Sequence, residues 1–86
     1  MLDNARDVLY CLMMLNYHIA IAAPGAKFVT ISSTPCAQGR AFDAVRDAAL
    51  ATYRVLKDDE AIEITSGGLT VWGPFVKGSK YIPTGA

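Results

Sequence analysis

Cys36 is the residue whose type and setting best suit a nucleophile. Thr34 and Pro35 precede it as a hydroxyl cap followed by a proline, which is typical of the start of a helix. The backbone N–H groups of a first helical turn stabilise a thiolate, and Arg40 would add positive charge nearby. One reading is therefore a thiol-dependent enzyme or redox sensor, although no second cysteine follows closely in the sequence to resolve an oxidised form.

His18 is the only histidine in the chain, and so the only imidazole that could act as a base or a metal ligand. A general base needs its nucleophile within about 3 Å. A metal site needs further ligands at suitable spacing, and the sequence has no CxxC, HxxH or EF-hand pattern. We expect a solvent-facing strand residue or a hydrogen-bonded interface residue, with no metal and no cofactor.

The charged residues are balanced, with eight basic and eight acidic side chains. Asp43 and Asp47 lie one helical turn apart, but Arg46 lies between them, so a solvated helix face fits better than a catalytic pair. Nucleic-acid modules usually carry a net basic footprint, which this chain lacks. Weak nucleic-acid binding is the third functional reading, through four basic residues: Arg40, Arg46, Lys77 and Lys80.

The elements that must position these residues come in two successive segments of the chain, which we call passes. Each pass is a helix followed by two strands. In the first pass, apolar residues at heptad spacing predict a helix over residues 3 to about 16. Period-2 alternation over residues 17–22 predicts a strand. Pro24-Gly25 fits the centre of a type II turn before a second strand at residues 28–32. A continuous helix over residues 3–22 is the alternative.

The second pass repeats this order. Thr34-Pro35 would begin the helix, or it begins nearer Arg40 because Gly39 weakens the first turn. The helix would end at residue 56 or 57. Alternation over residues 62–64, a glycine turn and a return strand over residues 69–72 complete the pass. The apolar stripe of this helix is expected at Phe42, Val45, Ala49, Thr52, Tyr53 and Leu56.

The two passes predict an α+β fold in the order α-β-β-α-β-β. Its sheet would be four-stranded and mainly antiparallel, with two helices packed on one face. An uncovered sheet face or an edge strand would then be free to pair with another molecule. Residues 1–73 would form a single domain, and residues 74–86, which contain several glycines and prolines, a C-terminal arm.

Residues 8–23 are apolar enough to suggest a signal peptide or a membrane span, but we expect neither. The side chains ahead of them carry no net positive charge, and the run is shorter than the roughly 20 residues that a spanning helix needs. Two cysteines are too few for a disulfide scaffold. We therefore expect a cytoplasmic protein with free thiols and no membrane partner.

The apolar content is high for so short a chain, at 52% of residues with a mean hydropathy of +0.27. A domain of this size has a modest core, so the surplus indicates a partner protein or a second copy. The first helix is apolar almost all round beyond Tyr10, which predicts a self-association face at Tyr10, Met13 and Met14.

Aromatic residues late in the chain are the best candidates for contacts to a partner protein. Trp72 is out of phase with Leu69 and Val71, which predicts an exposed indole unless the tail folds back over it. We predict a small intracellular, non-enzymatic protein-binding module. Adaptors, assembly subunits and inhibitors encoded by phages or mobile elements are of this size and kind. The expected contacts are Trp72, Phe75, Tyr81 and Arg40.

Overall fold

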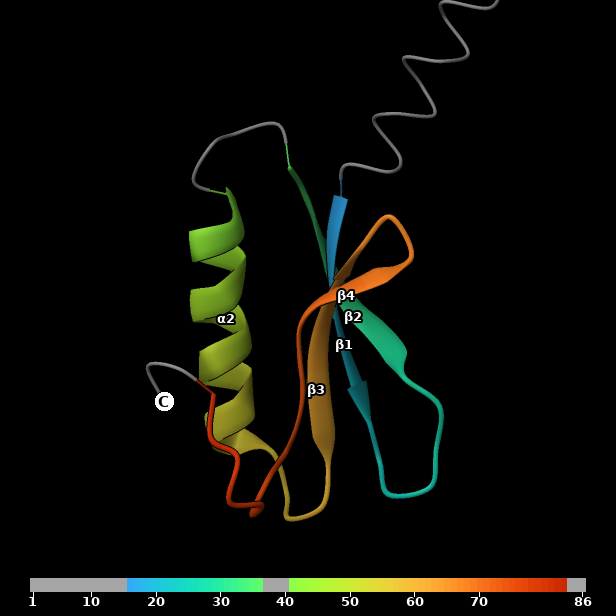
Figure 1. The fold of residues 1–86 in the computed structure, drawn as a ribbon, viewed down its shortest axis with the longest axis vertical. Coiled ribbons are helices and arrows are strands. Elements are labelled where there is room, and N and C mark those ends of the chain that lie inside the picture. Colours follow the sequence, from blue (N-terminus) through green and yellow to red (C-terminus); the bar gives the residue numbers. More distant parts are fainter. Residues whose placement is uncertain (1–15, 37–40, 84–86) are drawn as a thin grey trace, which may run out of the picture.

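The fold is a four-stranded antiparallel sheet with a helix against one face, as a computed structural model that describes residues 16–36 and 41–83 shows (Figure 1). The strands lie in the order β2-β1-β3-β4, and each neighbouring pair is antiparallel. The elements are β1 (Asn16–Ala22), β2 (Val29–Pro35), α2 (Ala41–Val55), β3 (Ala61–Ser66) and β4 (Leu69–Val76).

The α+β class and the four-stranded antiparallel sheet are confirmed, with α2 as the one helix among the described residues. The predicted helix over residues 3 to about 16 lies outside the described part of the chain, except that Asn16 already belongs to β1. The alternative of a continuous helix over residues 3–22 is wrong, because β1 occupies its last seven residues and hydrogen-bonds to strands on both sides.

The first hairpin forms as the sequence predicts. The N–H of Ala26 donates to the carbonyl oxygen of Ala23 at 2.9 Å, and Gly25 between them has a φ of 75°. A positive φ at the third turn position is what a type II turn requires, and glycine adopts it without steric cost.

The predicted helix start at Thr34-Pro35 is wrong, because both residues lie in β2. The run from Val29 to Thr34 is rich in β-branched residues, which favour an extended strand. Proline is tolerated at the end of an edge strand, where it removes no necessary ladder hydrogen bond. α2 is described from Ala41 onward, so Cys36 directly follows a strand.

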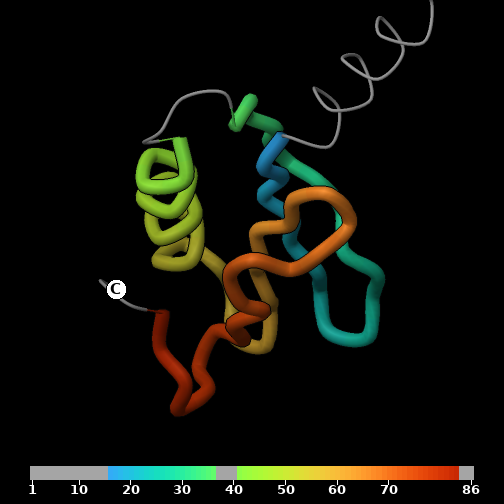
Figure 2. The backbone as a smooth tube through the Cα atoms, turned by 45° about the horizontal axis from the view of Figure 1, so that its top comes forward, coloured from blue at the N-terminus to red at the C-terminus, as the bar shows by residue number. Residues whose placement is uncertain are grey.

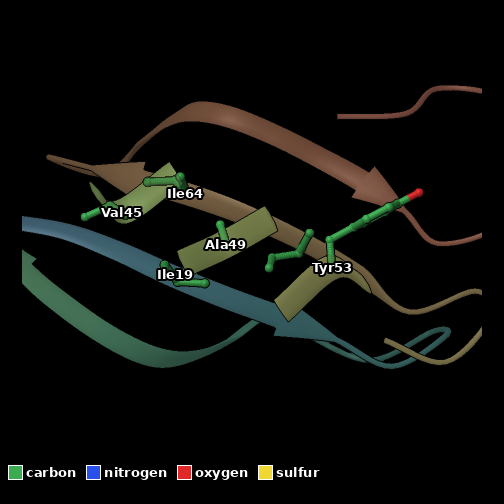
Figure 3. Close-up of a cluster of buried hydrophobic side chains, with 6 residues drawn as sticks. Ile19, Val45, Ala49, Tyr53 and Ile64 are labelled. Atoms are coloured by element: carbon green, nitrogen blue, oxygen red, sulfur yellow. The ribbon is translucent and has the colours of Figure 1, made fainter. Parts of the chain in front are cut away.

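The core lies between α2 and the centre of the sheet. Val45, Ala49 and Tyr53, spaced one helical turn apart, point from α2 toward β1 and β3 (Figure 3). Phe42 and Leu56 pack partly buried against this cluster, as the predicted stripe required. The sheet contributes the buried residues Ile19, Ile62 and Ile64.

Cross-strand pairing builds two rows of side chains across the helix side of the sheet, each running from β2 to β4. The central positions of both rows are isoleucines on β1 and β3, and the outer positions differ in size and polarity. The first row is Ser32, Ile19, Ile64 and Trp72, and the second is Val29, Ile21, Ile62 and Phe75.

Two irregularities in β4 decide where its aromatic side chains lie. Val71 is an extra residue between the partners of Ile64 and Thr65, and a second extra residue lies at Gly73-Pro74. Each bulge places two residues opposite one and so changes the face of those that follow. Trp72 and Phe75, three residues apart, consequently share the helix side of the sheet and pack partly buried against the core.

β4 runs to Val76, so the predicted end of the strand at residue 72 is wrong, and the strand crosses the boundary predicted after Gly73. The division into a domain and an arm stays a prediction. Residues 77–83 then turn back beside the C-terminal end of α2, as the two views of the chain show (Figure 2). Pro83 in this segment is fully buried.

Candidate functional sites

Cys36 lies in a small polar cluster at the end of the sheet where β2 finishes. The Sγ of Cys36 is 3.8 Å from the Oγ of Ser66, the last residue of β3. Tyr17 lies on β1, between β2 and β3, and pairs with Thr34 on one side and with Ser66 on the other. Partial burial raises the pKa of the Tyr17 hydroxyl, and the neighbouring Cys36 thiol raises it further. The ring of Tyr17 meets that of Phe42 edge to face at 5.5 Å, which ties the cluster to α2.

This setting differs from the one predicted for Cys36. The first turn of a helix would have surrounded the thiol with N–H groups, whereas the contacts of Cys36 in the structure are the hydroxyls of Tyr17 and Ser66. Arg40, the predicted source of positive charge, lies outside the described residues. The described surroundings of the half-buried thiol therefore contain hydrogen-bonding groups but do not include the helix terminus.

His18 and Ser33 form a second polar pair, on the face of the sheet opposite α2. They are cross-strand partners in β1 and β2, and the Nδ1 of His18 is 2.7 Å from the Oγ of Ser33. This distance would suit a base and its nucleophile. Ser33, however, is exposed to solvent, and no group of three or more His, Cys, Asp or Glu within residues 16–36 and 41–83 could hold a metal ion.

The predicted partner-binding residues occupy three different settings. Trp72 and Phe75 come together edge to face, with ring centroids 4.7 Å apart, and both are half-buried. The bulges turn Trp72 toward the helix side of the sheet, where it packs against the core. Tyr81 is 69% exposed, and the Nζ of Lys80 lies 5.4 Å from its ring centroid. Arg40 lies outside the described residues.

The predicted self-association residues, Tyr10, Met13 and Met14, also lie outside the described part of the chain. Within it, large exposed apolar side chains occur on both outer strands of the sheet and on the segment after β4, and also at Phe28 before β2 and at Val55, the last residue of α2. On β2 they are Val29 and Ile31, and on the second hairpin and its continuation they are Leu69, Val71, Val76, Tyr81 and Ile82.

Lys77 has a role that the sequence reading missed. Its Nζ donates to the carbonyl oxygens of Tyr53 and Arg54, each at 3.0 Å, and lies 4.7 Å from the ring centroid of Tyr53. The last carbonyls of a helix lack partners and carry the negative end of its dipole, so a cation stabilises them. Residues 58–60 are acidic and oppose that dipole. This acidic run was the signal in the sequence that a cation from another part of the chain is needed at the end of the helix.

The basic residues proposed for nucleic-acid binding do not form a free strip among the described residues. Lys77 is engaged at the end of α2, and Arg46 forms an ion pair with Asp43 at 3.6 Å while lying over the ring of Phe42. Lys80 lies over Tyr81.

Comparison of the chain with protein-family models, with curated proteins and with solved structures finds no match. Among the described residues, no helix is long and apolar enough to cross a membrane.

Proposed function

We propose that the chain is a small intracellular protein-binding module without catalytic activity, which acts by occupying a surface of a partner protein. The observation that supports this is the apolar surface of the second hairpin and its continuation. Five large apolar side chains there are each more than a third exposed: Leu69, Val71, Val76, Tyr81 and Ile82. These side chains lie along one stretch of the chain, on both faces of β4 and on the segment after it, and are available to a partner protein that contacts this stretch.

Side chains, and not the main chain, would make the contacts at this surface. The bulges at Val71 and at Gly73-Pro74 interrupt the regular pairing of β4, and Pro74 has no N–H to donate. The half-buried pair of Trp72 and Phe75 supports the strand from the helix side. Tyr81 is the exposed aromatic residue best placed to act as an anchor in a partner's pocket.

The proposal keeps the predicted first helix, over residues 3 to about 16, and its place on the same face of the sheet as α2. It also keeps Tyr10, Met13 and Met14 as apolar contacts of that helix, and Arg40 as a partner contact. Adaptors, assembly subunits and inhibitors encoded by phages or mobile elements are the functional types that match its size.

The test is capture of partner proteins from the native host on the immobilised full chain. The double variant Leu69→Glu/Val71→Glu places two charges on the exposed side chains of β4 and should lose every specific partner. The matched control is Ile31→Lys, which places a charge on the other outer strand and should retain them. Equal recovery with both variants, or no specific partner with the unaltered chain, would contradict the proposal.

A thiol-dependent enzyme or redox sensor is the second candidate, and the placement of Cys36 beside the hydroxyls of Tyr17 and Ser66 is what favours it. Reaction of Cys36 with a thiol reagent at pH 6 no faster than free cysteine would remove it. Weak nucleic-acid binding is the third, and the absence of a salt-dependent shift with DNA or RNA would remove that reading.

A further inference from the structure

β2 is an outer strand of the sheet, and its exposed edge is open among the described residues. It pairs with β1 along one side, and no described residue pairs with its other side. An open edge presents main-chain N–H and C=O groups that can pair with another strand. Proteins usually block such edges with charged side chains, prolines, bulges or a covering element.

β2 lacks charged side chains and no described strand pairs with its open edge, although it has one bulge and a proline at its end. Between Val29 and Thr34 the strand contains no charged residue and no proline, and Pro35 comes only at its end. Its one irregularity is Ile31, an extra residue between the partners of Ile19 and Ala20. Val29 and Ile31 are 63% and 48% exposed, so the edge also offers apolar contacts.

We propose that the open edge of β2 pairs antiparallel with β2 of a second copy around a two-fold axis, which joins the two sheets into one. In such a pair each residue faces a residue of the same strand, so any charge near the axis would face its own copy. β2 carries none, and the chain has no net charge to hold two copies apart. No register of the two β2 strands therefore places like charges of these strands opposite each other.

The same geometry limits the assembly to a dimer. Two-fold pairing uses the open edge of β2 in both copies, so only the β4 edges remain at the ends of the joined sheet. Those edges are interrupted by the bulges and by Pro74, and they do not offer a regular row of hydrogen-bonding groups. Dimerisation is independent of partner binding at the second hairpin.

The test is the mass of the full chain by light scattering after size exclusion, at concentrations from about 1 µM to about 1 mM. We expect twice the chain mass of 9.2 kDa at the upper end. Ile31→Lys should raise the dimer dissociation constant about tenfold or more, because it introduces a like charge into each of the two paired strands. The matched control is Val71→Lys, at a similarly exposed position on β4 (44%), which should dimerise like the unaltered chain.

Circular dichroism establishes that each variant is folded, and Val29→Lys replaces Ile31→Lys if the bulge does not tolerate lysine. Three outcomes would overturn the proposal. They are a monomer at the highest concentration, an assembly larger than a dimer, and a dimer that the folded β2 variant does not weaken more than Val71→Lys does.

Discussion

The two outer strands occupy equivalent places in the sheet but bury very different side chains. In the same cross-strand row, β2 places an exposed Ser32 beside Ile19, whereas β4 places a half-buried Trp72 beside Ile64. Both neighbours are buried isoleucines, so the difference arises in the outer strands. β4 uses two bulges to turn aromatic residues toward the core, and β2 leaves its apolar residues at the surface. One outer strand completes the core, and the other is available for pairing.

The largest expected effect comes from the second bulge of β4. Gly73 has a φ of 88°, and a Cβ there would lie 2.8 Å from the carbonyl oxygen of Ile62. Gly73→Ala should therefore cost about 3 kcal/mol of unfolding free energy, from backbone strain and from the clash together. Urea unfolding followed by circular dichroism measures it.

Gly25→Ala in the first hairpin is the matched control. Gly25 has a φ of 75°, but a Cβ added there would meet nothing within 4 Å, so the cost should be about 1 kcal/mol from backbone strain alone. Equal losses for the two variants would show that the close approach at Gly73 contributes nothing.

The second prediction compares the two ends of one row. Trp72→Ala should cost about 2 kcal/mol, because the indole packs on Phe75 and on the core while remaining half exposed. Ser32→Ala, at the other end of the row, should change stability by less than about 0.5 kcal/mol. Unfolding by urea gives both values, and similar losses would contradict the asymmetry of the hairpins.

The sheet was predictable because its signals are local. The alternation around Ile19 and Ile21, the Pro24-Gly25 turn and the alternation of Ile62 and Ile64 each specify backbone conformation within a few residues, and each was confirmed. The start of the helix was misread because Thr34-Pro35 fits both a helix start and the end of an edge strand. The β-branched residues before it decided between them.

The candidate sites were less predictable because they depend on contacts between distant residues. Trp72 was predicted to lie out of phase with Leu69, but the pairing of Leu69 with Ser66 and of Trp72 with Ile64 places both on the helix side of the sheet. The bulge at Val71 breaks the alternation that period-2 reasoning assumes. The hydrogen bond of His18 with Ser33 depends on the register of β1 and β2. Lys77 reaches the end of α2 only because β4 runs past the glycine at residue 73.

The third prediction tests whether the second hairpin also anchors α2. Lys77→Met keeps most of the apolar stem but removes the charge that binds the last carbonyls of the helix, so it should cost about 1 kcal/mol. Lys80→Met is the matched control, since Lys80 lies over the exposed ring of Tyr81 and should contribute almost nothing. Thermal and urea unfolding measure both, and a neutral Lys77→Met would show that α2 does not depend on this contact.

The smallest effect is expected at the first hairpin, through the raised pKa of Tyr17. An unfolded tyrosine titrates near pH 10, and the folded chain holds the Tyr17 proton to a higher pH. The folded state therefore binds more protons than the unfolded state only above about pH 10, and there the contribution of Tyr17 to stability falls as pH rises through the folded pKa.

Tyr17→Phe removes this titration. As pH rises from 7 to about 11, the unaltered chain should therefore lose free energy of unfolding relative to Tyr17→Phe. Tyr81→Phe, at an exposed ring after β4, is the control and should track the unaltered chain throughout. Urea midpoints at each pH provide the comparison. If Tyr17→Phe also tracks the unaltered chain, then neither partial burial nor the neighbouring Cys36 thiol raises the pKa of Tyr17 in the folded chain.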